Sequence, residues 1–330
     1  MKKKRIYIVI LVLILISLIL LFIDKNTYKE YSKNYFYMDT YINIKINSTK
    51  SKKEMDNIFN DIDYLYSSYH KLTSRYDKYD GIVNVYYLNE ILDNNEEIEI
   101  DKRLSDIIDI GILYYDKTNG LFNIASGNLT SIWKVFIDNC DELPSNLDVN
   151  INIDDIVLDG NKYIKYNDVK LDLGAISKGY VTELVGKYLE DNNIDSYIIN
   201  AGGNVKVGKA YNKDSYVVGI TNPNNKNDIF TKVNVNNLSI VTSGNYQRYC
   251  SFNDKIYGHI INPYTKLPSD YMKSVTVISS SSLLADIYST YLYLLPVEDG
   301  MKIVNSTSDI EAIWYIDSDK IVRSDNFNYE

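Results

Sequence analysis

The chain of 330 residues contains only two cysteines, Cys140 and Cys250. Neither stands at the short spacing that a cysteine-based metal site requires, so no such site is expected. A disulfide between them is one interpretation if the chain works outside the cell. Two unpaired thiols are the favoured interpretation, because a chain of this length does not need a covalent link to stabilise its core.

Clusters of lysine and arginine are missing beyond the amino terminus, and the formal net charge is -9. Binding to nucleic acid depends on clustered positive charge, so the composition argues against a nucleic-acid partner. An acidic chain that handles a phosphorylated ligand would need a divalent cation between the two.

Three common catalytic motifs are also missing. No Gly-x-Gly-x-x-Gly follows an expected strand, and the chain has no P-loop. The nucleophile elbow of α/β-hydrolases is absent, so Ser243 and His259 do not suggest a hydrolase pair. These absences argue against a Rossmann dinucleotide site, a P-loop nucleotidase and an α/β-hydrolase.

The amino terminus has the pattern of a membrane anchor. Residues 1–5 are basic, and residues 6–23 form an uninterrupted apolar run that is just long enough to span a bilayer as a helix. Positive charge before the run predicts a cytoplasmic tip and an extracytoplasmic remainder. A cleaved signal peptide is the competing interpretation, but no cleavage pattern follows. We therefore expect a single-pass protein of the cell membrane, with a tether at 24–33 and a soluble extracytoplasmic domain at 34–330.

Periodicity predicts one α+β domain, with one or two lobes. Helices are expected at 52–69, 104–115 and 176–190, and after a cap at Ser281 or Ser282. Strands are expected at 41–47, 197–199, 240–244 and 275–278, with a turn at 222–228 between two further strands. Residues 138–170 are predicted to be loop-like with short strands.

Two stretches carry residues suited to ligand binding. Residues 170–180 bring Asp172, two glycines and Lys178 to the passage from an apolar run into a helix. Asp286 and Thr290 stand four residues apart on an expected helix, so their side chains face the same way and offer hard oxygen ligands to Mg²⁺. A capped helix with a solvated aspartate remains the alternative for the second stretch.

Histidine offers one candidate base. His259 stands between a glycine and two isoleucines, where it would serve as a general base near neutral pH or as a buried structural residue. His70, in the polar stretch after a helix, is expected to have no role. Gly202-Gly203 and residues 242–244 would allow a phosphate close to the backbone, and tight turns explain them equally well.

Read together, these stretches resemble the ApbE family, the FAD:protein FMN transferases, over roughly residues 34–315. The matching motifs, in the order of the family, are Met38-Asp39-Thr40, Gly120-Leu121-Phe122-Asn123 with Gly127 and Trp133, residues 171–179, Asn200-Ala201-Gly202-Gly203, residues 242–246, His259-Ile260-Ile261-Asn262-Pro263 with Thr265 and Pro268, and Ala285-Asp286 with Thr290. Each motif alone is weak, but their co-occurrence in this order is specific.

The resemblance implies an α+β fold of mixed sheets with flanking helices, related to the T-fold. It also implies an Mg²⁺-dependent transfer of FMN from FAD to a threonine or serine hydroxyl of an extracytoplasmic acceptor protein, with release of AMP. The physical requirements agree, because cleaving a diphosphate needs charge neutralisation and a base for the attacking hydroxyl.

By matching position, the resemblance also assigns roles to single residues. His259 would be the base, and Mg²⁺ would be held by the Ala175 carbonyl and the side chains of Asp286 and Thr290. Ser289 falls where some members place another acidic ligand. The contacts to FAD would come from Met38, Tyr79, Leu121, Phe122, Asn123, Asp172, Lys178 and the backbone near Ile260.

Four positions depart from the commoner family pattern. Asn123 and Asn262 stand where many members have aspartate, Asp39 replaces a frequent glycine, and Lys266 replaces the glycine after Thr265. Two other functions remain open: a metal-dependent FAD pyrophosphatase that gives FMN and AMP, and a flavin-binding protein without turnover.

Overall fold

The computed structural model describes residues 4–5, 7–8, 10–15, 27–91, 96–317 and 320–329. Among these residues no helix is both long and apolar enough to cross a membrane. Part of the expected anchor, residues 16–23, lies outside the described residues, as do residues 24–26 of the expected tether. Residues 29–33, also expected in the tether, instead begin the first strand of the folded domain.

An eight-stranded sheet forms the centre of the fold, with the strand order β1-β2-β6-β7-β10-β13-β14-β15. Its strands are β1 (Lys29–Tyr37), β2 (Thr40–Ser48), β6 (Ser196–Ala201), β7 (Asn204–Val207), β10 (Leu238–Gly244), β13 (Ser274–Ser279), β14 (Glu311–Asp317) and β15 (Lys320–Arg323). All of these neighbours pair antiparallel. The expectation of a mixed sheet is therefore wrong for the described strands, because short hairpins join β1 to β2, β6 to β7 and β14 to β15.

Three smaller sheets stand apart from the central one. They are the three-stranded sheet of β3 (Ile98–Glu99), β5 (Lys162–Lys165) and β4 (Ile156–Asp159), the hairpin of β8 (Tyr216–Asn222) and β9 (Asn225–Val235), and the hairpin of β11 (Tyr249–Phe252) and β12 (Lys255–Gly258). The turn expected at 222–228 is shorter than predicted, because only residues 223–224 separate β8 from β9 and residues 225–228 belong to β9.

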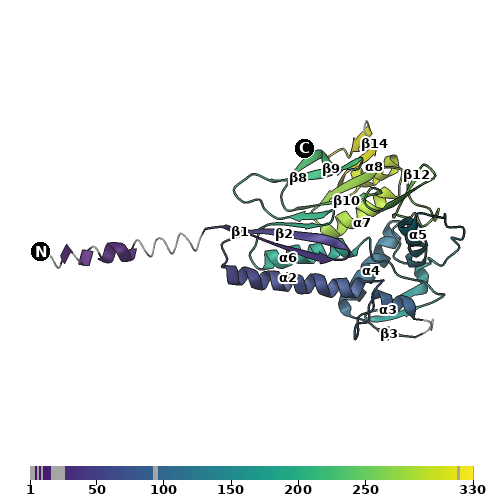
Figure 1. Ribbon diagram of the computed structural model, residues 1–330, viewed down its shortest axis with the longest axis horizontal. Helices are drawn as coiled ribbons and strands as arrows, with labels where there is room; N and C mark the ends of the chain where they lie inside the picture. Colours follow the sequence, from purple (N-terminus) through teal and green to yellow (C-terminus); the bar gives the residue numbers. More distant parts are fainter. Residues whose placement is uncertain are drawn as a thin grey trace.

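The described helices of the domain pack mainly on one face of the central sheet. They are α2 (Lys52–Thr73), α3 (Val85–Glu90), α4 (Lys102–Lys117), α5 (Gly127–Asn139), α6 (Ser177–Asp191), α7 (Ser282–Tyr293) and α8 (Val297–Ser306), with the short 3-10 helix η1 (Ile153–Asp155). Figure 1 shows α2 and α6 along one side of β1 and β2, with β8 and β9 on the opposite side of the domain. The same view shows α4 and α5 at the end of the sheet farthest from the amino terminus.

Alternation along the strands produces these two covered faces. In β6, Tyr197 and Ile199 belong to the core under the helices, whereas Ile198 faces the smaller core that includes β8 and β9. In β13, Val277 and Ile278 divide in the same way. The sheet is therefore buried on both sides.

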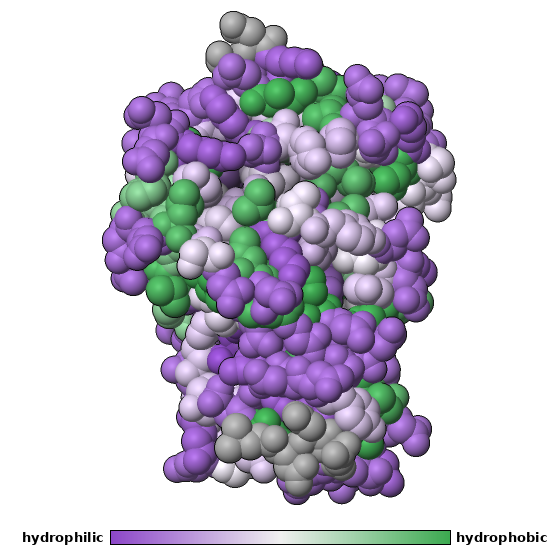
Figure 2. Space-filling model, turned by 90° about the vertical axis from the view of Figure 1, so that its right-hand side faces the viewer, coloured by the Kyte–Doolittle hydropathy of each residue, from purple (hydrophilic) through white to green (hydrophobic). Residues whose placement is uncertain are grey.

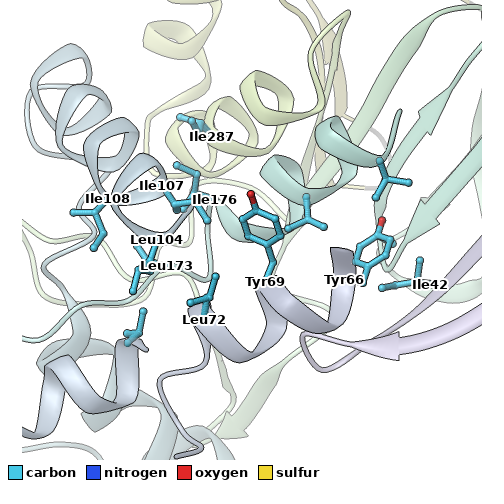
Figure 3. Close-up of a cluster of buried hydrophobic side chains, with 14 of the residues drawn as sticks. Ile42, Tyr66, Tyr69, Leu72, Leu104, Ile107, Ile108, Leu173, Ile176 and Ile287 are labelled. Carbon is cyan, nitrogen blue, oxygen red and sulfur yellow. The ribbon is translucent and has the colours of Figure 1, made fainter. Parts of the chain in front are cut away.

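The largest hydrophobic core lies where segments distant in sequence converge (Figure 3). Tyr69 and Leu72 of α2 meet Ile107 of α4, Ile176 just before α6, and Ile287 of α7, and all five side chains are buried. This core fixes the start of α6 against α7. The candidate ligands in residues 170–180 and on α7 are thereby held on a rigid base.

Most predicted elements are confirmed, with wider bounds. The strand predicted at 41–47 lies within β2, and the helices predicted at 52–69, 104–115 and 176–190 correspond to α2, α4 and α6. Helix α5 was not predicted, because its first turns hold residues that are weak helix formers, such as Gly127 and Asn128.

Candidate active site

A large cavity of about 1140 Å³ lies beside the carboxyl-terminal end of β10, the start of α6 and α7. Eleven of the twelve residues predicted to act in catalysis or binding line it: Met38, Leu121, Phe122, Asn123, Asp172, Ala175, Lys178, His259, Ile260, Asp286 and Thr290. The remaining one, Tyr79, is not among the lining residues. Residues separated by more than two hundred positions in the chain thus meet around one space.

Asp286 is held at the wall of this cavity by the close packing of α6 and α7. Helix α7 begins after Ser281, whose side chain accepts a hydrogen bond from the Leu284 N–H. The Asp286 carboxylate is buried, and its Oδ2 accepts a hydrogen bond of 2.6 Å from the Gly179 N–H. A Cβ at position 179 would stand 2.4 Å from the Asp286 Cβ, so this approach requires glycine.

A backbone carbonyl is also available just before α6. Ala175 precedes the N-cap Ile176, so its carbonyl lies outside the hydrogen bonds of the helix, and among the described residues nothing donates to it. The Gly179 N–H is in the first turn of α6, where N–H groups have no partner within the helix, and it donates to Asp286. Both Ala175 and Asp286 line the cavity.

Thr290 completes a set of three oxygen atoms. It lies one turn after Asp286 on α7, and within the described residues its hydroxyl makes no hydrogen bond. Mg²⁺ is commonly bound by one or two carboxylates together with other oxygens and substrate phosphates. A carbonyl and a hydroxyl without other partners among the described residues, together with a carboxylate that is bonded only through Oδ2, fit this requirement. No group of three or more His, Cys, Asp or Glu side chains suited to a metal occurs in the described part of the chain.

The electrostatics of Asp286 also favour an external cation. Burial raises the pKa of its carboxyl group, while Lys178, the Gly179 N–H and the Asn204 amide oppose that rise. No lysine or arginine within the described residues forms an ion pair with it. The Asn204 Nδ2 nearby is buried without a hydrogen bond of normal geometry. Polar groups left in this state are costly unless a ligand satisfies them.

His259 faces the cavity from the end of the β11–β12 hairpin. The residue is exposed to the open cavity, and its Nδ1–H donates to the Arg248 carbonyl at 3.3 Å. This bond leaves Nε2 as the nitrogen that can accept a proton. Desolvation by the surrounding protein, together with the charges of Lys178 and Arg248, lowers the pKa of His259 to about 4. The imidazole is therefore neutral at physiological pH.

The model of the ApbE family matches residues 38–314. The chain belongs to the ApbE family. This result confirms the resemblance carried by the sequence motifs.

Several curated relatives are named FAD:protein FMN transferase. One from Klebsiella pneumoniae (strain 342) is 32% identical over 213 residues, which make up 62% of this chain and 66% of that protein. One from Haemophilus influenzae is 25% identical over 294 residues, or 84% of this chain and 80% of that protein. For the Klebsiella protein, and for one from Buchnera aphidicola with 64%, the match spans less than two thirds of the relative's length.

Solved structures of the family share the fold. The ApbE protein of Thermotoga maritima gives a TM-score of 0.80 at 24% identity, and the flavin transferase ApbE of Vibrio cholerae gives 0.75 at 21%. Each match covers 91% of this chain and 98% of the other. The α+β architecture of the chain is thus that of the ApbE family.

Two departures from the ApbE pattern have a local structural role. The Asn123 Oδ1 accepts from the Ala125 N–H at 2.8 Å, and its Nδ2 donates to the Ile151 carbonyl at 2.9 Å. The Asn262 Oδ1 accepts from the Tyr264 N–H at 2.9 Å. Both oxygens stabilise turns, as an aspartate oxygen would.

Ser289 does not take the place of an acidic metal ligand. It is fully buried, and its hydroxyl donates to the Asp286 carbonyl at 2.9 Å and pairs with the Ser243 hydroxyl at 2.8 Å. It is not among the residues that line the cavity. Its role is to join α7 to the end of β10.

Arg75 is an important cavity residue that sequence patterns missed. Its guanidinium forms an ion pair with Asp172 and donates to the Thr130 hydroxyl and to the Gly127 carbonyl, each at 2.6 Å. Asp172 also accepts from the Thr130 hydroxyl at 2.7 Å and the Gly174 N–H at 2.9 Å. Burial would raise the pKa of Asp172, but Arg75 and these hydrogen bonds hold it below its usual value.

His70, expected to have no role, lines the cavity and forms hydrogen bonds with Met38 and Tyr79. Its Nδ1 accepts from the Met38 N–H at 3.2 Å, so Nε2 carries the proton and bonds the Tyr79 hydroxyl at 3.1 Å. Tyr79 is thereby directed towards His70. Tyr76 lines the cavity and is 57% exposed, so it is one of the aromatic residues there whose ring is available for stacking.

Cys140 and Cys250 form a disulfide, so the favoured interpretation of two unpaired thiols is wrong. Their Cα atoms lie 5.5 Å apart although 110 residues separate them. The cause is the packing of Trp133 and Phe136 of α5 against Tyr257 of the hairpin. This small core and the disulfide attach the hairpin that carries His259 to α5.

Proposed function

We propose that the chain is an Mg²⁺-dependent FAD:protein FMN transferase. The observation that carries this proposal is the placement of His259 on the same cavity as three residues with oxygen groups suited to Mg²⁺: Ala175 with its carbonyl, Asp286 with its carboxylate and Thr290 with its hydroxyl. The names of the relatives add support. The acceptor would be a threonine or serine hydroxyl of another protein.

The proposed reaction breaks a phosphoanhydride bond in FAD and forms a phosphoester bond to the acceptor. The acceptor oxygen forms a bond to the phosphorus of the FMN half of FAD, the phosphoanhydride bond breaks, and AMP leaves. Mg²⁺ held by Ala175, Asp286 and Thr290 would neutralise negative charge on the diphosphate. Lys178, which donates to the Gly174 carbonyl at 3.1 Å and forms no ion pair within the described residues, adds positive charge at the same wall.

His259 would accept the proton of the attacking hydroxyl at Nε2. The bond from its Nδ1 to the Arg248 carbonyl fixes the tautomer, and its low pKa keeps Nε2 unprotonated before the substrate binds. The negative charge of a bound diphosphate would raise that pKa and make the imidazole a stronger base. A base placed in this way contributes about a hundredfold to ten-thousandfold to the rate.

The flavin end of FAD would lie against the other side of the cavity. Met38, Leu121, Phe122, Asn123 and the backbone near Ile260 line it. These residues supply apolar contacts and backbone groups for an aromatic ring system. Asp172 would act there in its ion pair with Arg75.

The test is a transfer assay with the full chain, FAD, Mg²⁺ and a flavin-acceptor domain, read by the mass of the acceptor. We expect the acceptor to gain the mass of FMN, and His259→Ala to slow this gain at least about a hundredfold while FAD still binds. An acceptor that gains no mass would sink the proposal. Free FMN and AMP formed without acceptor would indicate the pyrophosphatase, and FAD retained without any product would indicate a binding protein.

We also propose that the domain works outside the cytoplasm, attached to the membrane through residues 6–23. The disulfide supports an oxidising compartment. The face on the side of α5 and β12 mixes hydrophobic with polar residues over its upper half (Figure 2), as suits contact with an acceptor protein. Protease added to intact cells should digest the domain, and a domain protected until lysis would contradict this location.

A further inference from the structure

An ion pair joins two segments at the rim of the cavity. Arg248, which directly precedes β11, bonds the carboxylate of Asp39 through Nη2 and approaches the Asp39 carbonyl at 3.5 Å. Asp39 lies in the turn between β1 and β2, 209 residues away in the sequence. Both residues line the cavity. The contact between Arg248 Nη2 and the carboxylate and carbonyl of Asp39 thus connects the two segments.

The ion pair is weakly held. The side chain of Asp39 is 74% exposed and that of Arg248 is 52% exposed, and ion pairs in such positions contribute little to stability. By comparison, the Arg75 side chain is 8% exposed, and its two Nη atoms bond Asp172 and three further acceptors. Arg248 is therefore the guanidinium at this cavity that an incoming anion can take over at low cost.

Backbone conformation does not explain the carboxylate at position 39. Asp39 has a φ of 56° in a hairpin turn, a conformation that asparagine and glycine adopt at least as readily. The charge of Asp39 is thus what distinguishes it there, and its partner is Arg248. The Arg248 carbonyl also accepts from His259 Nδ1, so this residue links the rim to the candidate base.

We propose that Arg248 binds the diphosphate of the dinucleotide, and that Asp39 occupies its guanidinium until the ligand displaces it. The identity of the ligand rests on the proposed function. Arginine suits this task because its planar group of donors matches phosphate oxygens. The exchange replaces one exposed carboxylate with a phosphate group, and the Arg248 carbonyl remains bonded to His259 throughout.

The experiment measures FAD binding to the full chain by flavin fluorescence, without acceptor. Arg248→Gln should weaken binding about tenfold or more, because charged hydrogen bonds to phosphate are lost. Asp39→Asn should tighten binding about two- to fivefold, because the competing carboxylate is removed from an exposed pair. In the Arg248→Gln background, Asp39→Asn should have no effect, since the competition no longer exists.

Two controls separate this mechanism from general electrostatics. Riboflavin, which has no phosphate, should bind all of these variants equally. Asp138→Asn removes one negative charge from an ion pair with Lys134 at the same cavity, and it should not reproduce the gain of Asp39→Asn. A gain from Asp39→Asn that persists without Arg248, or an equal gain from Asp138→Asn, would overturn the proposal. Circular dichroism of Arg248→Gln would show whether the variant is folded.

The outcome is independent of catalysis. A chain that shows this dependence of FAD binding on Arg248 but transfers no FMN would refute the proposed transferase and leave the exchange intact. A chain that transfers FMN with additive effects of the two substitutions would refute the exchange alone.

Discussion

Two carboxylates, one buried and one partly buried, border the same cavity in opposite surroundings. Asp172 accepts from Arg75, Thr130 and the Gly174 N–H, and these partners lower its pKa in spite of burial. Asp286 accepts a hydrogen bond from the Gly179 N–H and has no ion pair within the described chain, and burial raises its pKa.

The difference indicates that Asp172 stabilises the structure around the cavity, whereas Asp286 is available to a ligand. The charge of Asp172 is already balanced by the protein, and its bonds to Arg75 and Thr130 join the loop after α2 to α5. The charge of Asp286 is not balanced by an ion pair within the described chain, and under the proposed function Mg²⁺ would balance it. The hydrogen-bond and ion-pair partners of a carboxylate at a cavity wall therefore indicate whether it is structural or available to a ligand.

The largest loss of stability should follow when Asp172, like Asp286, has no ion-pair partner among the described residues. Arg75→Met leaves the Asp172 carboxylate without its cation in a mostly buried site, and breaking such a pair costs about 3–5 kcal/mol of unfolding free energy. Urea denaturation would measure the loss. Adding Asp172→Asn should restore part of it, because the unpaired charge is then removed. Equal stability of the single and double variants would show that the pairing is unimportant.

The converse change should affect activity and spare the fold. In Asp286→Asn the amide oxygen still accepts the Gly179 N–H, but the charge that would hold Mg²⁺ is lost. We expect the transfer rate to fall about a hundredfold or more, equivalent to about 3 kcal/mol. Stability without metal should be unchanged or higher, because an uncompensated buried carboxylate is removed.

The effect of Mg²⁺ on the melting temperature tests the role of Asp286 independently of the transfer rate. Mg²⁺ should raise the melting temperature of the unaltered chain, since a ligand that binds only the folded state stabilises it. The same addition should not shift the melting temperature of Asp286→Asn. A variant that still responds to Mg²⁺ would place the metal elsewhere.

The Asp286 side of the cavity was the part most accessible from sequence. Asp286 and Thr290 share a helix face through their spacing, and that local pattern needs no tertiary information. The family resemblance, not the pattern, pointed to the Ala175 carbonyl. That carbonyl stands before the N-cap Ile176, and its meeting with Asp286 at one cavity depends on how closely α6 approaches α7. No periodicity in the sequence encodes that distance.

The partners of Asp172 could not be predicted from the sequence. Arg75 follows α2 in an irregular, tyrosine-rich passage, and its partners lie 52 to 97 positions further along the chain. The disulfide was hidden for the same reason, because α5 and β11 meet through tertiary packing. Helix α5 itself left a signal: Leu129, Trp133 and Phe136 are buried at a spacing of four and three. The polar residues of its first turns obscured it.

The smallest effect should be the loss, at acidic pH, of the stability that the ionised Asp172 carboxylate provides. Because its folded pKa lies below the value of about 3.9 for an unfolded aspartate, its ionised form stabilises the fold. That contribution is complete above the unfolded pKa and is lost as the pH falls through the folded pKa. The difference in unfolding free energy between the unaltered chain and Asp172→Asn should therefore be constant from neutral pH to about pH 5 and narrow below it. A difference that stays constant down to pH 3 would mean that Arg75 does not act on Asp172 through its charge.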